Sequence, residues 1–195
     1  MRSAMILVAD GSGMRGRHTL AREETGMRRT THITIEHVVV ESNLSYEQVK
    51  ASLEARLGVA GDLNELRRQL AAVNTPWEQV MQAFEKRLGT SGFSIFTKVE
   101  HGDLLSLAGR PRRVSQYAIG NPLLAIQMVE RVPEVALYAP LRLAVYEGDG
   151  GRTLVAYDRF SSLLAQYDNA EISPIARLVE QKLEALVAEA TRNGH

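Results

Sequence analysis

The chain has 195 residues, 45% of them hydrophobic, and its 23 basic side chains balance its 23 acidic ones. A chain of this length can bury a core without disulfides or a structural metal, and a net charge of zero argues against nucleic acid as a partner. The lack of cysteine excludes disulfides, thiolate nucleophiles and cysteine-ligated metal centres. No apolar run approaches the roughly 20 residues of a membrane helix, so we expect a cytoplasmic protein without a membrane segment.

Residues 1–30 differ in composition from the rest of the chain, with frequent glycine, arginine and methionine and no apolar stripe. The segment GSGMRG, Gly11 to Gly16, satisfies the G-x-G-x-x-G pattern of dinucleotide-binding proteins. The following segment has only Leu20 as a large apolar residue, however, so a helix there could not pack on a sheet. We therefore expect a flexible leader over residues 1–30, with either Met1 or Met27 as the natural start.

The ordered domain is predicted to begin at about residue 31. In THITIEHVVVE, Ile33, Ile35 and Val39 alternate with polar neighbours, as along a strand with one buried face. We expect a strand here, and a single domain over residues 31–195.

Two copies of one helical pattern follow, NLSYEQVKASLEARLG and NTPWEQVMQAFEKRLG, and half of their aligned positions are identical. Ser45 and Gln48 have the spacing of a capping box in the first copy, as Thr75 and Glu78 do in the second. Each copy has an apolar stripe at helical spacing and ends in a glycine that suits a left-handed terminator. The stripes are Tyr46, Val49, Leu53 and Leu57, then Trp77, Val80, Met81, Phe84 and Leu88, and the terminators are Gly58 and Gly89.

We interpret the repeat as scaffold rather than as a paired binding site, because its shared residues are those that begin, face and end a helix. A third amphipathic helix lies between the copies, and we call residues 58–89 the helical insertion. Two copies cannot cover their own apolar faces as a solenoid would, so they must pack on another surface. Tyr46, Trp77, Met81 and Phe84 predict that part of this surface lies in a homodimer interface.

From Gly92 onward, strands and helices alternate. FSIFTKVE and RRVSQYAIG are predicted strands, and LRLAVYEGDGGRTLVAYD is a predicted hairpin with glycines in its turn. Asn121-Pro122 and Ser173-Pro174 begin two further helices. This order predicts an α+β fold with a largely antiparallel sheet, helices packed on one face, and the helical insertion.

The stretch from His101 to Tyr167 resembles the bacterial proteins grouped as the domain of unknown function 302 family. The most specific shared pieces are HG, IGNPL, YAPLR and YD. The resemblance implies a compact α+β domain from about residue 31 to the C-terminus, commonly homodimeric, with no assigned activity and no catalytic residues. It also implies that the helical insertion over residues 58–89 is longer than in the shorter members of the family. Many members have a cysteine just before the Asn-Pro pair, where this chain has Ile119-Gly120, so no thiol-based role is implied here.

Several polar residues do not belong to the predicted helix faces. They lie at strand ends and in loops, where pockets form. Five of them are candidate ligand-binding residues: His101, Asn121, Tyr138, Arg142 and Asp158. Nearby, Arg110, Arg112 and Arg113 have planar side chains that suit phosphate or carboxylate. A small anionic ligand is the expected partner.

Structural explanations compete with these assignments. His101 could cap the segment that follows it, and Asn121 is expected to cap a helix. Arg142 and Asp158 lie near the ends of paired strands, where a cross-strand ion pair would be natural. The three arginines could form a solvated loop and edge strand.

Three functions therefore stay open, and the favoured one is a non-catalytic domain that binds or senses a small ligand. The second is an enzyme that uses His101 as general acid or base with Asp103 or Asp158 as its orienter, and the third is a purely structural dimer. His32, His37 and His101 lack metal-ligand spacing, so no metal site is expected. No cofactor is indicated.

Overall fold

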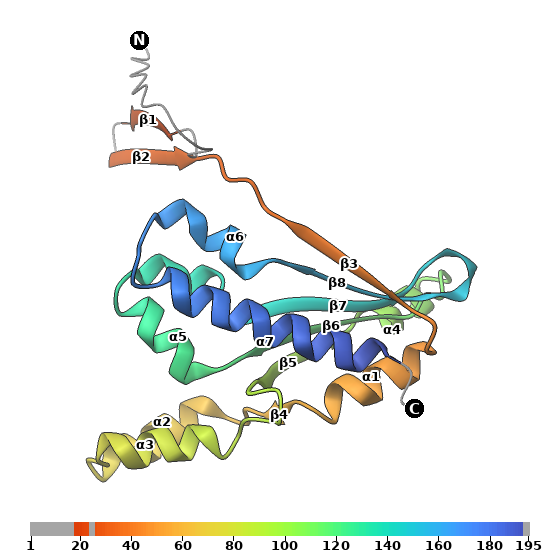
Figure 1. The fold of residues 1–195 in the computed structure, drawn as a ribbon, viewed down its shortest axis with the longest axis horizontal. Coiled ribbons are helices and arrows are strands. Elements are labelled where there is room, and N and C mark those ends of the chain that lie inside the picture. The colour runs from red at the N-terminus through yellow and green to blue at the C-terminus, as the bar shows by residue number, and fades with distance from the viewer. Residues whose placement is uncertain (1–17, 24–25, 193–195) are drawn as a thin grey trace.

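The structure is a computed structural model that describes residues 18–23 and 26–192. Its main body is a six-stranded sheet in the order β3-β8-β7-β6-β5-β4, in which all neighbours are antiparallel except β4 and β5. The strands are β3 (His37–Ser42), β4 (Gly58–Val59), β5 (Ser94–Glu100), β6 (Val114–Gly120), β7 (Leu141–Glu147) and β8 (Thr153–Asp158). The predicted α+β fold with a largely antiparallel sheet is confirmed (Figure 1).

The described residues also form seven α-helices and three short 3-10 helices. The α-helices are α1 (Tyr46–Glu54), α2 (Leu63–Ala72), α3 (Trp77–Glu85), α4 (His101–Leu107), α5 (Pro122–Val129), α6 (Phe160–Leu164) and α7 (Ser173–Thr191). The 3-10 helices are η1 (Pro133–Leu137), η2 (Asp149–Gly151) and η3 (Ala165–Tyr167). Figure 1 shows α7 lying across the sheet beside α1, while α2 and α3, which we call the arm, extend away from it.

The core lies between α1, α6 and α7 and one face of the sheet. Alternate residues of each central strand point into it, because successive side chains of a strand face opposite sides. The sheet contributes Tyr117, Ile119, Leu143, Val145, Val155 and Tyr157, and α7 contributes Ala176, Val179, Leu183, Leu186, Val187 and Ala190. Leu178 of α7 does not contribute to this core and is 42% exposed.

Two further strands, β1 (His18–Glu23) and β2 (Gly26–Thr31), pair as a separate antiparallel sheet. They lie where the sequence predicted a flexible leader, so that part of the chain has regular structure. The GSGMRG segment lies outside the described residues. The domain boundary at about residue 31 stays a prediction.

The first strand of the main sheet differs from its prediction in both start and phase. It begins at His37, and Val38 and Val40 pack against the core, whereas Ile35 and Val39 are 43% and 46% exposed. The three consecutive valines of β3 do not alternate with polar residues, so the sequence does not show which face of the strand is buried. Pairing with β8, where Val40 lies opposite Val155, decides this. A shift of one residue turns every side chain of a strand to the other face.

The first copy of the repeat begins as predicted and the second does not. Ser45 and Gln48 form a complete capping box at α1. At α3 the predicted cap by Thr75 and Glu78 is absent, since the N-cap position is Pro76 and no side chain caps the helix. Pro76 has extended backbone angles, which moves the helix start one residue beyond the predicted one.

Gly58 and Gly89 have a different role from the predicted left-handed terminators, because neither has a positive φ. The two ends of the repeat instead pack backbone against backbone. A Cβ atom on Gly58 would lie 1.8 Å from the Arg87 carbonyl oxygen, and one on Gly89 would lie 2.2 Å from that of Arg56. Both glycine N–H groups donate to the Phe93 carbonyl oxygen at 2.9 Å. Close approach, rather than an unusual φ, requires glycine at both positions.

Candidate functional site

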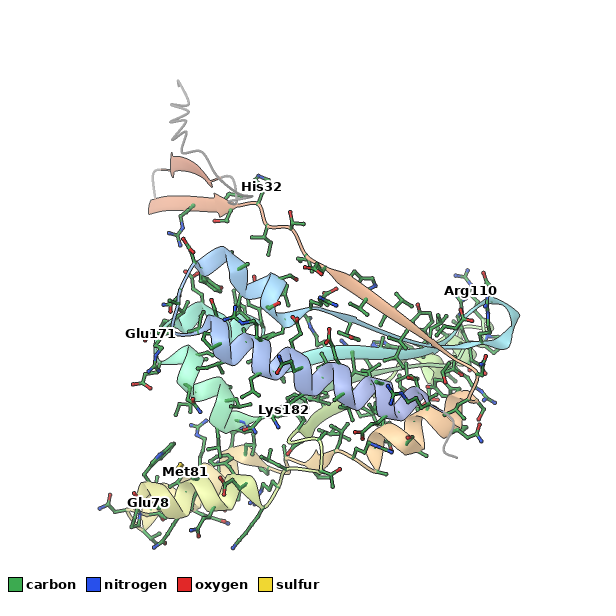
Figure 2. The ribbon with its side chains drawn as sticks, in the orientation of Figure 1. His32, Glu78, Met81, Arg110, Glu171 and Lys182 are labelled. Atoms are coloured by element: carbon green, nitrogen blue, oxygen red, sulfur yellow. The ribbon has the colours of Figure 1, made fainter. Side chains whose placement is uncertain are left out.

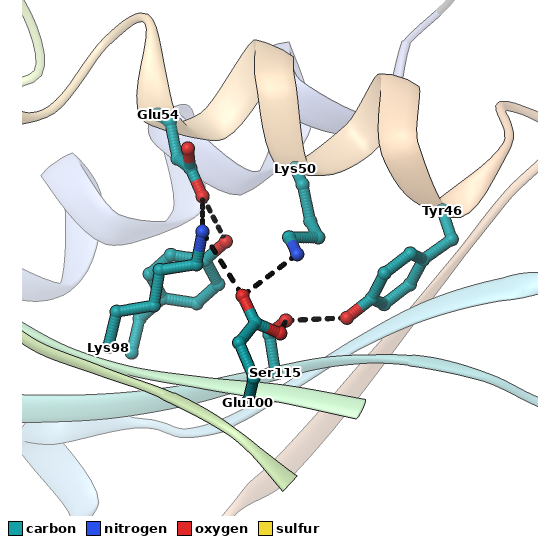
Figure 3. A network of polar contacts seen from close by, with 7 residues as sticks. Tyr46, Lys50, Glu54, Lys98, Glu100 and Ser115 are labelled. Atoms are coloured by element: carbon teal, nitrogen blue, oxygen red, sulfur yellow. Dashed lines mark hydrogen bonds and ion pairs between the residues drawn. The ribbon is translucent and has the colours of Figure 1, made fainter. Parts of the chain in front are cut away.

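A network of polar side chains connects α1 to β5 and β6 on the helix-covered face of the sheet (Figure 3). At one carboxylate, Glu100 Oε1 lies 2.9 Å from Lys50 Nζ and 3.1 Å from Lys98 Nζ, and Ser115 Oγ donates a hydrogen bond to Glu100 Oε2. At the other, Glu54 Oε1 accepts a hydrogen bond from the Tyr117 hydroxyl at 2.5 Å and lies 2.7 Å from Lys98 Nζ. Lys98 therefore bridges the two carboxylates.

The chain of hydrogen bonds extends to Tyr46, whose hydroxyl lies 2.5 Å from Ser115 Oγ. Because the Ser115 proton is donated to Glu100, the Tyr46 hydroxyl must be the donor in this contact. Tyr46, Lys50, Glu54, Lys98, Glu100, Ser115 and Tyr117 together are called the polar network.

Local geometry explains why these seven side chains meet. Residues four apart on a helix share a face, and residues two apart on a strand do the same. Cross-strand pairing places Lys98 opposite Tyr117 and Glu100 opposite Ser115. The polar network was not predicted from the sequence. The spacing within each segment was visible there, with Tyr46, Lys50 and Glu54 on one, Lys98 and Glu100 on a second, and Ser115 and Tyr117 on a third, but not the pairing between segments.

The pKa shifts in the polar network favour one charge state for each group. Burial by itself would raise the pKa of Glu100, but hydrogen bonds from Ser115, Lys50 and Lys98 outweigh it and lower the pKa to about 2. Burial would also raise the pKa of Glu54, but hydrogen bonds from Lys98 and Tyr117 outweigh it and lower this pKa.

The basic and phenolic groups shift in the complementary direction. The hydrogen bond to Glu54 raises the pKa of Lys98, and at Lys50 the hydrogen bond to Glu100 overcomes the opposing effect of burial and raises the pKa as well. Burial and the Glu54 carboxylate raise the pKa of the Tyr117 hydroxyl. Two carboxylates and two ammonium groups are thus ionised at neutral pH, and their charges cancel.

A pocket of about 450 Å³ adjoins this network at the end of the sheet where β5 and β7 stop and β6 begins. We call it the polar pocket. Arg113 Nη1 lies 3.5 Å from Glu147 Oε1, and the Arg113 guanidinium carbon lies 5.8 Å from the centre of the Tyr46 ring. Arg112 Nη2 lies 3.3 Å from Asp149 Oδ1, which is outside the pocket. The lining consists of Tyr46, Glu47, Lys50, Glu100, Gly102, Asp103, Ser106, Pro111, Arg112, Arg113, Val114 and Glu147.

His101 lies near the polar pocket without lining it. It is the first residue of α4, and its Nε2 atom is 3.2 Å from Gln116 Oε1. Within residues 18–23 and 26–192, no carboxylate forms a hydrogen bond or ion pair with His101.

A second pocket, of about 230 Å³, lies at the opposite end of β6, and Asn121 is one of its walls. We call it the apolar pocket. As predicted, Asn121 caps a helix: its Oδ1 atom accepts from the N–H groups of Leu123 and Leu124, while its Nδ2 atom donates to the Gly92 carbonyl oxygen at 3.0 Å.

The other sequence candidates lie near the same end of the sheet and do not converge on one point. The Tyr138 hydroxyl accepts a hydrogen bond from Gln166 at 2.9 Å. Asp158 contacts His37 of β3 at 2.7 Å in place of the expected ion pair with Arg142. The Arg142 side chain is exposed and has no ion-pair partner among the described residues. His101 is therefore separated from Asn121, which lies beyond the other end of β6.

In the described part of the chain, no group of three His, Asp or Glu side chains could hold a metal ion. Of the helices in that part, none combines the length and the apolar character needed to cross a membrane.

Comparison with known proteins finds a matching family and a solved structure of similar fold. A family model described as "Domain of unknown function DUF302" matches residues 70–190. A crystal structure of an uncharacterized conserved protein DUF302 from Bacillus stearothermophilus is similar in fold, with a TM-score of 0.55 and 17% sequence identity, over 80% of this chain and 98% of that one. No curated protein matches. The family match covers more than half of the sequence, and the chain therefore belongs to the DUF302 family.

Proposed function

We propose that this domain is a non-catalytic module that binds a small polar ligand in the polar pocket. The observation that carries the proposal is a pocket of about 450 Å³ whose lining includes Tyr46, Arg112 and Arg113. Its neighbour, the polar network, is internally neutral and holds Tyr46 and Lys50 in place. The volume of the polar pocket lies within the range of typical small-molecule sites.

The charges around the polar pocket refine the class of ligand. Three basic side chains and four acidic ones line it. Lys50 Nζ and Glu100 Oε1 pair with each other at 2.9 Å. The ion pairs of Arg112 and Arg113 lie nearer the surface, where such pairs are weak and can exchange for a ligand carboxylate. Glu47 and Asp103 have no ion-pair partner among the described residues. A ligand with both a carboxylate and an ammonium group suits this lining better than the purely anionic ligand suggested by the sequence.

The geometry offers less support for the enzyme hypothesis. General acid–base catalysis by His101 would need a partner that orients its ring. The ring contact that the structure provides is the Gln116 amide at 3.2 Å, and Asp158 is engaged with His37. We therefore propose binding without catalysis.

Thermal unfolding in the presence of three linear small molecules of equal carbon number tests the proposal. The probes are glutarate, δ-aminovalerate and cadaverine, which carry negative, mixed and positive charge. A ligand at about 100 times its dissociation constant adds about 2.7 kcal/mol to the free energy of unfolding. We expect δ-aminovalerate to raise the unfolding midpoint most, because only it can satisfy arginine and carboxylate together.

Matched variants locate the effect. Arg113→Ala should abolish the rise in midpoint, whereas Arg110→Ala, in the same loop but outside the lining, should retain it. Figure 2 shows Arg110 at this end of the molecule. His101→Ala should also retain the rise. If no probe, and no compound in a wider metabolite panel, stabilises the wild type, the structural-dimer hypothesis is the better one.

We also propose that the protein is a cytoplasmic homodimer and that the arm forms part of the dimer interface. Tyr46 cannot contribute as first expected, because it is 4% exposed and belongs to the core. Trp77 of the arm is 49% exposed, and Val73, directly after α2, is 75% exposed. Figure 2 shows Met81 on the arm as well. Light scattering at micromolar concentration should give the mass of a dimer, and a monomer would contradict this part of the proposal.

A further inference from the structure

The apolar pocket is built from segments that come together at the end of β6 opposite the polar pocket. Its floor is the hydrophobic core itself, since Phe93, Met128 and Phe160 line it and are 0%, 2% and 1% exposed. Residues 120–122 and 139–141 form two of its walls, and α5 forms a third through Ala125. Both wall segments belong to the IGNPL and YAPLR pieces of the sequence.

The volume of the pocket indicates the size of a ligand. A protein cavity of about 150 Å³ lined by aliphatic and aromatic side chains stays dry and binds benzene. The apolar pocket has about 230 Å³ and a similar lining. It can therefore accept a single aromatic ring with a short substituent.

Gly120 keeps part of this space open. A Cβ atom at this position would lie 3.3 Å from Phe96 Cε2 and 3.6 Å from Pro140 Cβ, between two side chains of the pocket wall. Any larger side chain at residue 120 would occupy space that a ligand could use. The glycine has no positive φ, so this close approach is the feature that explains it.

One polar group can orient a ligand in these apolar surroundings. An amide has two N–H groups, and Asn121 uses one of them for the Gly92 carbonyl oxygen. Its oxygen is occupied by the start of α5. The second N–H has no acceptor within residues 18–23 and 26–192, and Asn121 lines the pocket.

We infer that the apolar pocket is a second ligand site, separate from the polar pocket, for a small molecule with one aromatic ring and one hydrogen-bond acceptor. The ring lies against Phe93, Met128 and Phe160, and the acceptor faces the free N–H of Asn121. The absence of charged side chains in the lining excludes an ionic head group inside the pocket.

Titration of the full chain with acetophenone and ethylbenzene tests this site, because the two probes differ in a carbonyl group. The readout is the NMR signal of the Met128 methyl group, which is buried beside the pocket. We expect saturable shifts with both probes, and about fivefold tighter binding of acetophenone from one added hydrogen bond.

Two variants that fill the pocket should remove this binding. Ala125→Leu should weaken it by about tenfold or more, because a single added methylene already changes affinity in a hydrophobic pocket by that factor. Leu63→Phe fills the pocket from the arm side and serves if Ala125→Leu does not fold. Ala185→Leu, at an exposed position of α7, is the matched control and should bind as the wild type does.

Three results would overturn the inference. The first is a shift that grows linearly without saturation, and the second is a shift that persists unchanged in both filling variants. The third is a change of molecular mass in Ala125→Leu by light scattering, which would assign the space to a side chain of a second copy. Equal affinity for the two probes would overturn the role of Asn121.

Discussion

The two copies of the repeat have similar sequences and opposite environments. In the first copy, α1 lies against the sheet, and Val49 and Leu53 are fully buried. In the second copy, α3 has no buried side chain, and Trp77 is 49% exposed at the position equivalent to the buried Tyr46. The same amphipathic pattern therefore forms a core helix in one place and an arm helix in the other.

Equivalent positions of the two copies differ in whether their side chains belong to the polar network. Lys50 contributes to the polar network, and the equivalent residue of the second copy is Met81. Glu54 and Glu85 are identical and equivalent, yet Glu54 binds Tyr117 and Lys98 whereas Glu85 is exposed. The surface that a helix packs against, rather than the helix pattern, decides which side chains become part of a site.

The ends of the two copies, in contrast, remain alike. Arg56 and Arg87 each donate a hydrogen bond to the carbonyl oxygen four residues earlier, at 2.7 and 2.8 Å. Their own carbonyl oxygens accept from Ser91 and Ser94 hydroxyl groups. The crossing at Gly58 and Gly89 is therefore a nearly symmetric structural joint, which supports the interpretation of the repeat as scaffold.

Breaking this joint should have the largest effect. Gly58→Ala places a methyl group 1.8 Å from the Arg87 carbonyl oxygen, and backbone atoms must move to accept it. We expect a loss of about 3 kcal/mol or more in the free energy of unfolding, measured by urea denaturation. Val59→Ala, at a neighbouring position that is 71% exposed, is the control and should change it little. A stable Gly58→Ala protein would show that the joint is not tightly packed.

Shortening the same residue in both copies measures the difference in burial directly. Val49 is 0% exposed and its equivalent Val80 is only partly buried. Val49→Ala should lower the free energy of unfolding by about 2 kcal/mol or more, and Val80→Ala by clearly less. Equal losses in the same denaturation experiment would mean that the arm is packed as tightly as the core.

Lys50→Met, which gives the first copy the residue found at the equivalent position of the second, should change how stability depends on pH. The pKa of Glu100 in the folded protein, about 2, is below its ordinary value of 4.5. Its stabilisation is therefore complete above about pH 4.5 and is lost as the pH falls toward 2. Lys50→Met removes one of the hydrogen bonds that lower this pKa, so the loss of stability on acidification should become smaller.

The measurement for this variant is the free energy of unfolding at neutral pH and near pH 3, compared with the wild type. Lys86→Met, at an exposed position of the second copy, is the control and should leave the pH dependence unchanged. If wild type and Lys50→Met lost the same stability on acidification, Lys50 would not contribute to the pKa of Glu100.

The smallest expected effect compares the two helix starts. Ser45 accepts a hydrogen bond from the Gln48 N–H and takes part in a capping box, whereas Thr75 does not cap α3. Ser45→Ala should cost about 1 kcal/mol in thermal or urea unfolding, and Thr75→Ala close to none. A larger cost at Thr75 would reveal a role for its side chain outside helix capping.

The candidate site was only partly accessible to sequence reasoning. Asn121 was correctly expected to cap a helix, and its place in the wall of the apolar pocket follows from tertiary packing. The arginines of the loop before β6 were noted, and two of them line the polar pocket. The polar network was missed, because α1 and β5 are separated in sequence by the arm and no spacing rule joins them.

The sequence by itself determined the features that depend on neighbours along the chain: the capping box at Ser45, the stripe of α1, the glycine turn between β7 and β8, and the α+β order of elements. Hydrogen bonds and side-chain periodicity within a few residues suffice for these. Only the tertiary structure decided which face of β3 is buried, why Gly58 and Gly89 are glycines, and which charged residues meet. Those outcomes depend on contacts between distant segments, and local patterns carry no information about the partner surface.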